Sequence, residues 1–262
     1  MLKRLMAERM PYKFTELFSG DWKLFQKVLQ NPNTVFVYDN DGIFSDTSKL
    51  VHKRFSDKYG VVVKTSDIDS WTYLISVAKN LGLPEEDIKH VENDFYDPDV
   101  LGVAQSVLYI KPVMKKTMAF YGPERNYILT SRNPNLKDST LSWFERKFPE
   151  FLPENILIRD VGSKASGEDF KIEKIKGLAS KAPWVVFIDD ALTFVKSTLD
   201  ANIENCLVVN IPQGKVYPDF RHERLFVIKR FPDSIQALYP LMDAIERAFD
   251  GMSHNPIDTL NF

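Results

Sequence analysis

The segment VFVYDNDG at residues 35–42 decides the fold that we expect for this chain. Its four apolar residues are β-branched or aromatic, which is typical of a strand buried on both faces in the middle of a parallel sheet. The residues Asn40, Asp41 and Gly42 then supply the turn chemistry that ends the strand. In open α/β sheets, ligands bind just beyond the carboxyl ends of such strands. Because a carboxylate near a core is costly without a partner, Asp39 and Asp41 indicate a site for a metal ion or a phosphoryl group.

The composition is that of an ordinary soluble globular protein, with 44% hydrophobic and 27% charged residues among 262. This length is sufficient for one sizeable core and a smaller module. The formal net charge of -2 gives no reason to expect a nucleic-acid polymer or an anionic membrane as a partner. The single cysteine, Cys206, excludes an internal disulfide and lies in an apolar run, where we expect a buried structural thiol.

The N-terminal residues do not resemble a secretory signal, since the stretch is short, basic and interrupted by Glu8 before Pro11. No apolar run approaches the length that is needed to cross a bilayer. Together with the single cysteine, these features favour a soluble, cytoplasmic protein.

A long helical segment follows the strand at residues 35–39. Helical spacing and capping residues predict helices over residues 47–59, 70–81, 97–107 and a further one from Pro84, so roughly seventy residues separate this strand from the next. A standard crossover needs far fewer. We therefore expect residues 47–111 to form a helical cap domain over the strand ends, with residues 1–46 and 112–262 forming the core. The alternative is a set of extra helices packed beside the sheet.

From Lys111 onward, helices and strands alternate regularly. This alternation predicts a Rossmann-like three-layer α/β/α core with a parallel sheet. The expected strands cover residues 126–130, 155–158, 184–188, 206–211 and 225–229. The expected helices cover residues 112–120, 136–147, 170–180 and 234–249, and an earlier helix at residues 21–30 is expected to pack outside the sheet.

Polar residues also follow two of the later strands. Thr130, Ser131 and Arg132 end the strand at residues 126–130, and Asp189-Asp190 end the strand at residues 184–188. A single ending of this kind could be turn chemistry. Three such endings in one sheet, two of them with paired acids, indicate a shared site.

These residues resemble the haloacid dehalogenase (HAD) superfamily of phosphotransfer enzymes. Its first motif, an apolar strand ending in Asp-x-Asp-Gly, is matched at residues 39–42. Its second motif, a strand ending in Thr or Ser, is matched by Thr130, and its fourth, a strand ending in one or two acids, by Asp189-Asp190. The motifs occur in the family's order between Thr34 and Ile211, and the helical insertion resembles the family's helical cap.

The third motif of the family is a lysine near the start of the helix before the fourth motif. Lys171 is the first choice, because we expect it to open the helix at residues 170–180 and to direct its ammonium group to the strand ends. Lys164, in the preceding loop, is the second choice, and Lys174 the third. For any single lysine, a solvated surface charge is the alternative.

The resemblance implies a Mg²⁺-dependent phosphatase that hydrolyses a small phosphorylated metabolite, with a nucleotide among the candidates. Asp39 would attack phosphorus and form an aspartyl-phosphate, and Asp41 would protonate the leaving group and then activate water. The Asp39 side chain, the Asp41 backbone carbonyl, Asp189 and Asp190 would hold Mg²⁺, a hard cation that takes oxygen ligands.

The same resemblance assigns the phosphate-binding residues. Thr130 and the amide of Ser131 would hold phosphate oxygens, and Lys171 would offset the charge of the phosphate and of Asp39. Arg132 could meet a second anionic group of the substrate or pair with a nearby acid. A phosphomutase or other HAD phosphotransferase, and a non-catalytic HAD-fold binding protein, are the alternative functions. The sequence indicates no oligomeric state.

Overall fold

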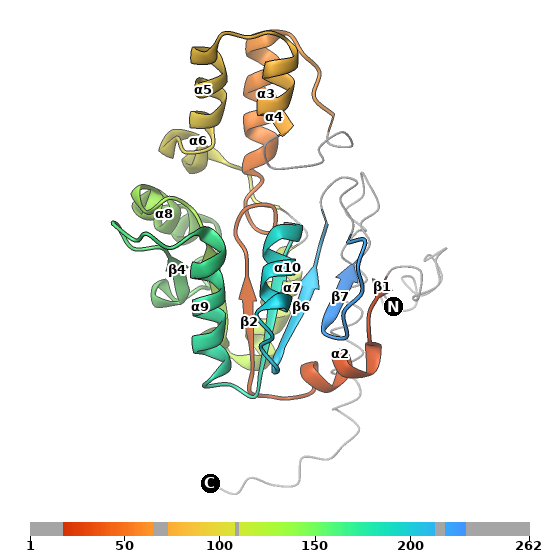
Figure 1. The fold of residues 1–262 in the computed structure, drawn as a ribbon. Coiled ribbons are helices and arrows are strands. Elements are labelled where there is room, and N and C mark those ends of the chain that lie inside the picture. Colours follow the sequence, from red (N-terminus) through yellow and green to blue (C-terminus); the bar gives the residue numbers. More distant parts are fainter. Residues whose placement is uncertain (1–17, 65–72, 108–109, 213–217, 229–262) are drawn as a thin grey trace, which may run out of the picture.

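The computed structural model describes residues 18–64, 73–107, 110–212 and 218–228 (Figure 1). Within these residues, the strands form one sheet in the order β1-β7-β6-β5-β2-β3-β4. Neighbouring strands are parallel, except that β1 pairs antiparallel with β7. The strands are β1 (Phe18–Ser19), β2 (Thr34–Tyr38), β3 (Asn126–Thr130), β4 (Ile156–Ile158), β5 (Trp184–Asp189), β6 (Cys206–Asn210) and β7 (Leu225–Ile228).

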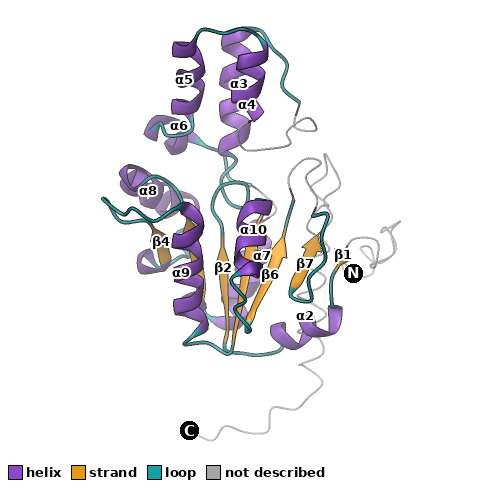
Figure 2. Cartoon of the chain, in the orientation of Figure 1, coloured by secondary structure: helices purple, strands orange, loops and turns teal. Residues whose placement is uncertain are grey.

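Helices cover both faces of this sheet (Figure 2). Residues of α2, α7 and α8 share one buried cluster with the sheet, and residues of α9 and α10 share another. The predicted Rossmann-like α/β/α core is therefore confirmed. The helices are α2 (Trp22–Leu29), α3 (Thr47–Tyr59), α4 (Tyr73–Asn80), α5 (Glu85–Asp94), α6 (Pro98–Val103), α7 (Ile110–Tyr121), α8 (Lys137–Lys147), α9 (Gly167–Ala179) and α10 (Leu192–Asp200), with 3-10 turns η3 (Pro123–Arg125), η4 (Pro134–Leu136) and η5 (Pro153–Asn155).

The strand β2 lies between β5 and β3 and is buried along its whole length. Its side chains alternate between the two faces, as the pleat of a strand requires. Phe36 and Tyr38 join the cluster of α2, α7 and α8, whereas Val35 and Val37 join that of α9 and α10. The apolar run is thus divided between two cores, and β2 carries its following residues to the centre of the sheet edge.

The helices α3 to α6 stand together beyond the carboxyl ends of the strands (Figure 1). They share a buried cluster of their own, which includes Phe55 of α3 and Val91 of α5. Two linkers join them to the sheet and pair with each other, since Asp46 N donates to Gln105 O at 2.9 Å. The division of the chain into a core and a cap at residues 47–111 stays a prediction.

Several elements differ from those expected from the sequence. The helix α9 begins at Gly167 rather than Phe170, because Ser166 Oγ caps it by accepting from Asp169 N at 3.0 Å. The helix α6 ends at Val103 rather than residue 107, since Ala104 leaves helical geometry. Both β1 and α10 were not predicted. The closing helix at residues 234–249 and residues 70–72 lie outside the described residues.

Among the residues that the structure describes, no helix has the length and apolar character that crossing a bilayer requires.

Candidate active site

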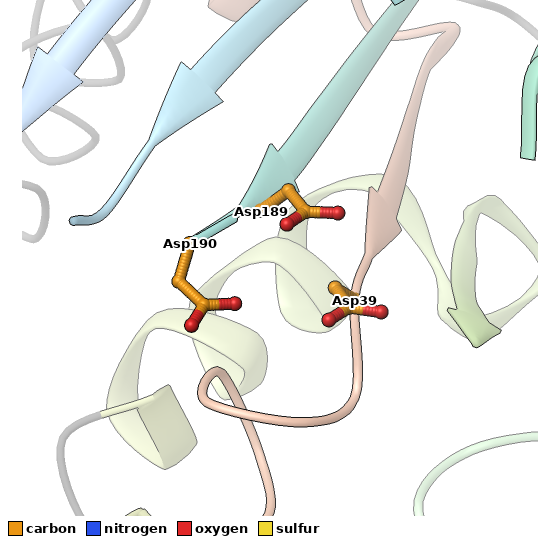
Figure 3. A group of neighbouring side chains, drawn as sticks. All are labelled: Asp39, Asp189 and Asp190. Atoms are coloured by element: carbon orange, nitrogen blue, oxygen red, sulfur yellow. The ribbon is translucent and has the colours of Figure 1, made fainter. Parts of the chain in front are cut away.

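Three carboxylates meet at the carboxyl edge of the sheet (Figure 3). Asp39 directly follows β2, and its backbone N–H donates to Ile188 O of β5 at 2.8 Å, which continues the parallel ladder by one residue. Asp189 ends β5 and Asp190 comes next. Oxygen atoms of the three side chains lie within 4.8 Å of one another. Gly42 turns the chain away with a φ of 81°, a conformation that favours glycine.

The Lys171 ammonium group lies between two of these acids. Its Nζ donates to Asp39 Oδ1 and to Asp189 Oδ2, each at 2.7 Å, and only 1% of the side chain is exposed. The same Nζ lies 3.8 Å from the ring centroid of Phe194 in α10, close enough for a cation–π interaction. Lys164, in contrast, is exposed in the loop between β4 and α9. The structure therefore brings Lys171 to the acids.

Lys171 reaches this position from a different place in its helix than the sequence suggested. It is the fifth residue of α9 and not its first, since the helix begins at Gly167. The expectation that Lys171 opens the helix was wrong, because Ser166 and Asp169 form a capping pair that starts the helix one turn earlier. The long side chain of Lys171 brings its ammonium group to the acids from the second turn of the helix.

Burial and mutual repulsion perturb the titration of this cluster. Burial raises the pKa of Asp39 to about 7; Lys171 opposes the shift, while Asp189 and Asp41 add to it. Burial, followed by Asp189 and Asp39, raises the pKa of Asp190 well above its usual range. For Lys171, burial would lower the pKa, but Asp189 and Asp39 raise it above its ordinary value. The lysine is thus firmly cationic, and the carboxylates still exceed the positive charge beside them.

The turn after β5 is fixed by a residue that the sequence analysis did not single out. The buried side-chain amide of Asn210, at the end of β6, donates to the carbonyl oxygens of Asp189 at 3.0 Å and Asp190 at 3.2 Å. Asp189 Oδ1 accepts from Ala191 N at 2.8 Å. These bonds hold the backbone of both acids. A polar residue near the end of another predicted strand, at residues 206–211, was the signal that could have identified Asn210.

Asp41 points to a different partner. Arg132 Nε donates to Asp41 Oδ2 at 2.8 Å, and Arg132 Nη2 donates to Asp41 Oδ1 at 2.6 Å. Burial alone would raise the pKa of Asp41, but the Arg132 guanidinium outweighs it and lowers that pKa below its usual value. Of the two roles that the sequence left open for Arg132, the structure shows the pairing with a nearby acid.

The expected phosphate-binding residues lie at the carboxyl end of β3, the strand that pairs with β2. Thr130 is buried at the end of β3, and its Oγ1 accepts from Arg132 N at 3.3 Å. The first turn of α9 packs closely on Ser131, since a Cβ at Gly167 would lie 3.0 Å from Ser131 Cβ. A glycine at this position lets α9 approach the loop that carries Ser131.

Comparisons with known proteins identify the fold. No family model matches the sequence, and no curated protein matches it. Among solved structures, a HAD family hydrolase from Deinococcus radiodurans R1 with bound phosphate and sodium has a TM-score of 0.50 at 13% identity, covering 82% of this chain and 97% of its own.

Two further structures are similar at a lower score. A putative haloacid dehalogenase-like hydrolase from Burkholderia xenovorans LB400 has a TM-score of 0.49 at 13% identity, covering 81% of this chain and 97% of its own. A putative beta-phosphoglucomutase from Bacteroides vulgatus has a TM-score of 0.46 at 14% identity, with coverages of 86% and 98%.

Fold and site together define a Rossmann-like α/β protein with an acidic cluster at the carboxyl edge of its parallel sheet. More particularly, the chain has the fold of a HAD family hydrolase, as the motifs of the sequence predicted.

Proposed function

We propose that this protein is a Mg²⁺-dependent phosphatase that hydrolyses a small phosphorylated metabolite through an aspartyl-phosphate on Asp39. One observation carries the proposal: Asp39 is held at the end of the central strand by Lys171, which it shares with Asp189. A nucleophilic carboxylate needs a fixed position in line with the leaving oxygen and positive charge around the phosphoryl group. The buried lysine supplies part of that charge.

The charge balance supports a divalent cation in the same site. Lys171 pairs with Asp39 and Asp189, and Arg132 pairs with Asp41, so two cations face these three carboxylates and that of Asp190 nearby, which leaves an excess of acidic groups. Burial is the main cause of the raised pKa values of Asp39 and Asp190, and the neighbouring acids raise them further. Clustered carboxylate oxygens are the ligands that Mg²⁺ prefers in proteins, so the donor set fits this ion.

The metal would be held by the side chains of Asp39, Asp189 and Asp190 and by the backbone carbonyl of Asp41. When bound, it supplies positive charge to the phosphoryl oxygens and to the carboxylates around them. The other steps depend on the chain's own groups. Thr130 and the backbone N–H of Ser131 hold phosphate oxygens; the parallel pairing of β3 with β2 supports this role.

The two carboxylates of the first motif have separate tasks. As the bond between Asp39 Oδ and phosphorus forms, the bond from phosphorus to the leaving oxygen breaks, and Asp41 donates a proton to that oxygen. Asp41 then takes a proton from the water that attacks the aspartyl-phosphate, and phosphate is released. Asp41 is thus ionised after the first step and protonated again after the second, so its proton is balanced over the cycle. The side chain is 38% exposed and can take up its first proton from solvent.

The helices α3 to α6 fit the role of a cap domain, with residues 47–111 as the proposed cap and residues 1–46 and 112–262 as the core. They lie beyond the carboxyl ends of the strands (Figure 1), which supports a cap that contacts the non-phosphoryl part of the substrate. We propose a small phosphorylated metabolite, rather than a nucleic-acid polymer or a membrane, as the substrate, and the cytoplasm as the location.

Phosphate release tests the proposal directly. Purified protein with Mg²⁺ is assayed on 4-nitrophenyl phosphate and on a panel of phosphorylated metabolites, with free phosphate and transferred phosphate measured separately. Asp39→Asn should abolish release while the protein stays folded. Asp200→Asn, at an exposed acid in the last turn of α10, is the matched control and should keep full activity. Full activity in Asp39→Asn, or no phosphate release from any compound, would refute the proposal.

A further inference from the structure

The Arg132 side chain forms its hydrogen bonds with other groups of the protein. Its side chain is 5% exposed, and its Nε and Nη2 donate to the two oxygens of Asp41 at 2.8 Å and 2.6 Å. Such a two-bond fork fixes the orientation of a carboxylate as well as its position, which a lysine ammonium group does not do.

The remaining donors of the guanidinium also meet protein acceptors. Nη1 donates to Thr140 Oγ1 of α8 at 3.1 Å, and Nη2 lies 3.2 Å from Thr47 Oγ1. With its amide oxygen turned towards the guanidinium, Asn40 accepts from Nε at 3.0 Å. Arg132 thus joins α8 to the segment that follows β2, and these contacts leave it no role in holding a substrate anion.

The same contacts determine which part of Asp41 is free. A carboxylate offers about four lone-pair positions to donors. Arg132 occupies one on each oxygen, and Thr47 Oγ1 donates to a second on Oδ1 at 2.9 Å. With the amide oxygen of Asn40 turned towards the guanidinium, the remaining position is on Oδ2. A proton there leaves all three hydrogen bonds in place.

We propose that Arg132 is a positioning residue for Asp41, directing Oδ2 to the leaving oxygen, and that it does not bind substrate. This inference rests on the proposed phosphatase function. In the step concerned, the bond from Asp39 to phosphorus forms, the bond to the leaving oxygen breaks, and the proton on Asp41 Oδ2 passes to that oxygen. Without the fork, this step lacks an aligned acid, whereas phosphate binding by Thr130 and Ser131 continues.

The dependence of rate on the leaving group tests this role. We would measure kcat/KM with Mg²⁺ for a series of substituted phenyl phosphates, from 4-nitrophenyl phosphate to phenyl phosphate. Nitrophenolate leaves readily without a proton, whereas phenolate gains more from one. Arg132→Lys keeps the charge but loses the fork. We expect about threefold loss or less with 4-nitrophenyl phosphate and about 100-fold loss with phenyl phosphate, the lower end of what general acid catalysis supplies.

Two comparisons separate positioning from general damage. Asp41→Asn should show the same steep dependence, and Asp41→Asn with Arg132→Lys should lose no more than Asp41→Asn alone, because both residues act in one step. Arg224 is a matched buried arginine just before β7, at the opposite edge of the sheet, where it donates to Asn202 Oδ1 at 2.6 Å. Arg224→Lys should lower stability without changing the dependence on the leaving group.

Three results for Arg132→Lys would overturn the proposal. They are an equal loss of kcat/KM for every substrate of the series, a raised KM with the dependence on the leaving group unchanged, and faster hydrolysis of phenyl phosphate than by the wild type. If Arg132→Lys does not fold, Thr140→Val, which removes only the Nη1 acceptor, should give a smaller change of the same kind. An unchanged dependence in that variant would also overturn it. A wild-type protein that hydrolyses no member of the series refutes the phosphatase function itself, a result distinct from those above.

Discussion

Lys171→Met is the substitution that tests the electrostatics of the site most directly. Methionine keeps most of the length and volume of the lysine stem but removes the ammonium group that contacts Asp39 and Asp189 at 2.7 Å. Breaking a buried ion pair by removing one partner costs about 3–5 kcal/mol, because the other charge stays buried.

The loss of stability should depend on pH in a defined direction. Without Lys171, the carboxyl groups of Asp39 and Asp190 have pKa values still further above those of the unfolded chain. A group of this kind contributes its full stability below its unfolded pKa and loses it as the pH rises through the folded pKa. We therefore expect Lys171→Met to be destabilised by about 3–5 kcal/mol at pH 8 and by clearly less at pH 5.

Urea unfolding of the wild type and the variant at the two pH values, in the absence of divalent cations, measures this effect. Lys174→Met is the matched control on the same helix, because Lys174 pairs at 3.3 Å with the exposed Glu173 and such surface pairs contribute about 0–1 kcal/mol. If Lys171→Met loses no more stability than Lys174→Met, or loses the same amount at both pH values, Lys171 is not the counter-charge of the acids.

Three further outcomes follow from the structure. Mg²⁺ should raise the melting temperature of the wild type more at pH 8 than at pH 5, because the raised pKa values of Asp39 and Asp190 keep these carboxyls protonated at low pH; equal shifts would contradict this. Cys206 is buried with a pKa raised to about 12, so a thiol reagent should label it only at the rate of unfolding. Gly167→Ala should lower the free energy of unfolding by about 1–3 kcal/mol, because it crowds the loop after β3, and it should raise KM. Gly177 has open space around it, so Gly177→Ala should be stabilising or neutral in thermal melts and should leave KM unchanged.

The sheet was predictable from the sequence because its strands are strongly patterned. The apolar runs of β2, β3 and β5 are buried and end in polar residues, so both their type and their ends could be recognised. The helix α10 was missed because it starts directly after the acids of β5 and its N-cap, Ala191, offers no side-chain hydrogen bond. Capping residues cannot reveal a helix that lacks a side-chain cap and is stabilised by its packing on the sheet.

The site could be predicted only in part, because its geometry depends on contacts between distant segments. The position of β2 beside β5 brings Asp39 to Asp189, although 150 residues separate them; no local pattern states which strands are neighbours. The role of Arg132 could not be decided for the same reason, since its acid partner lies 91 residues away. The ring of Phe194 beside Lys171 had no signal in the sequence.

The two cations divide the site into parts with different tasks. Lys171 pairs with both Asp39 and Asp189, so it offsets their negative charge where the phosphoryl group would be attacked. The Arg132 guanidinium is paired with Asp41, so it does not offset the charge around Asp39 and Asp189. A phosphate dianion therefore meets an excess of carboxylate unless a divalent cation is bound, so the cation should raise the affinity for phosphate. By thermodynamic linkage, phosphate raises the affinity for the cation by the same factor. The proposed site thus makes metal and substrate binding depend on each other. Asp190 belongs to this coupling as a proposed metal ligand whose pKa is raised by burial and then by Asp189 and Asp39.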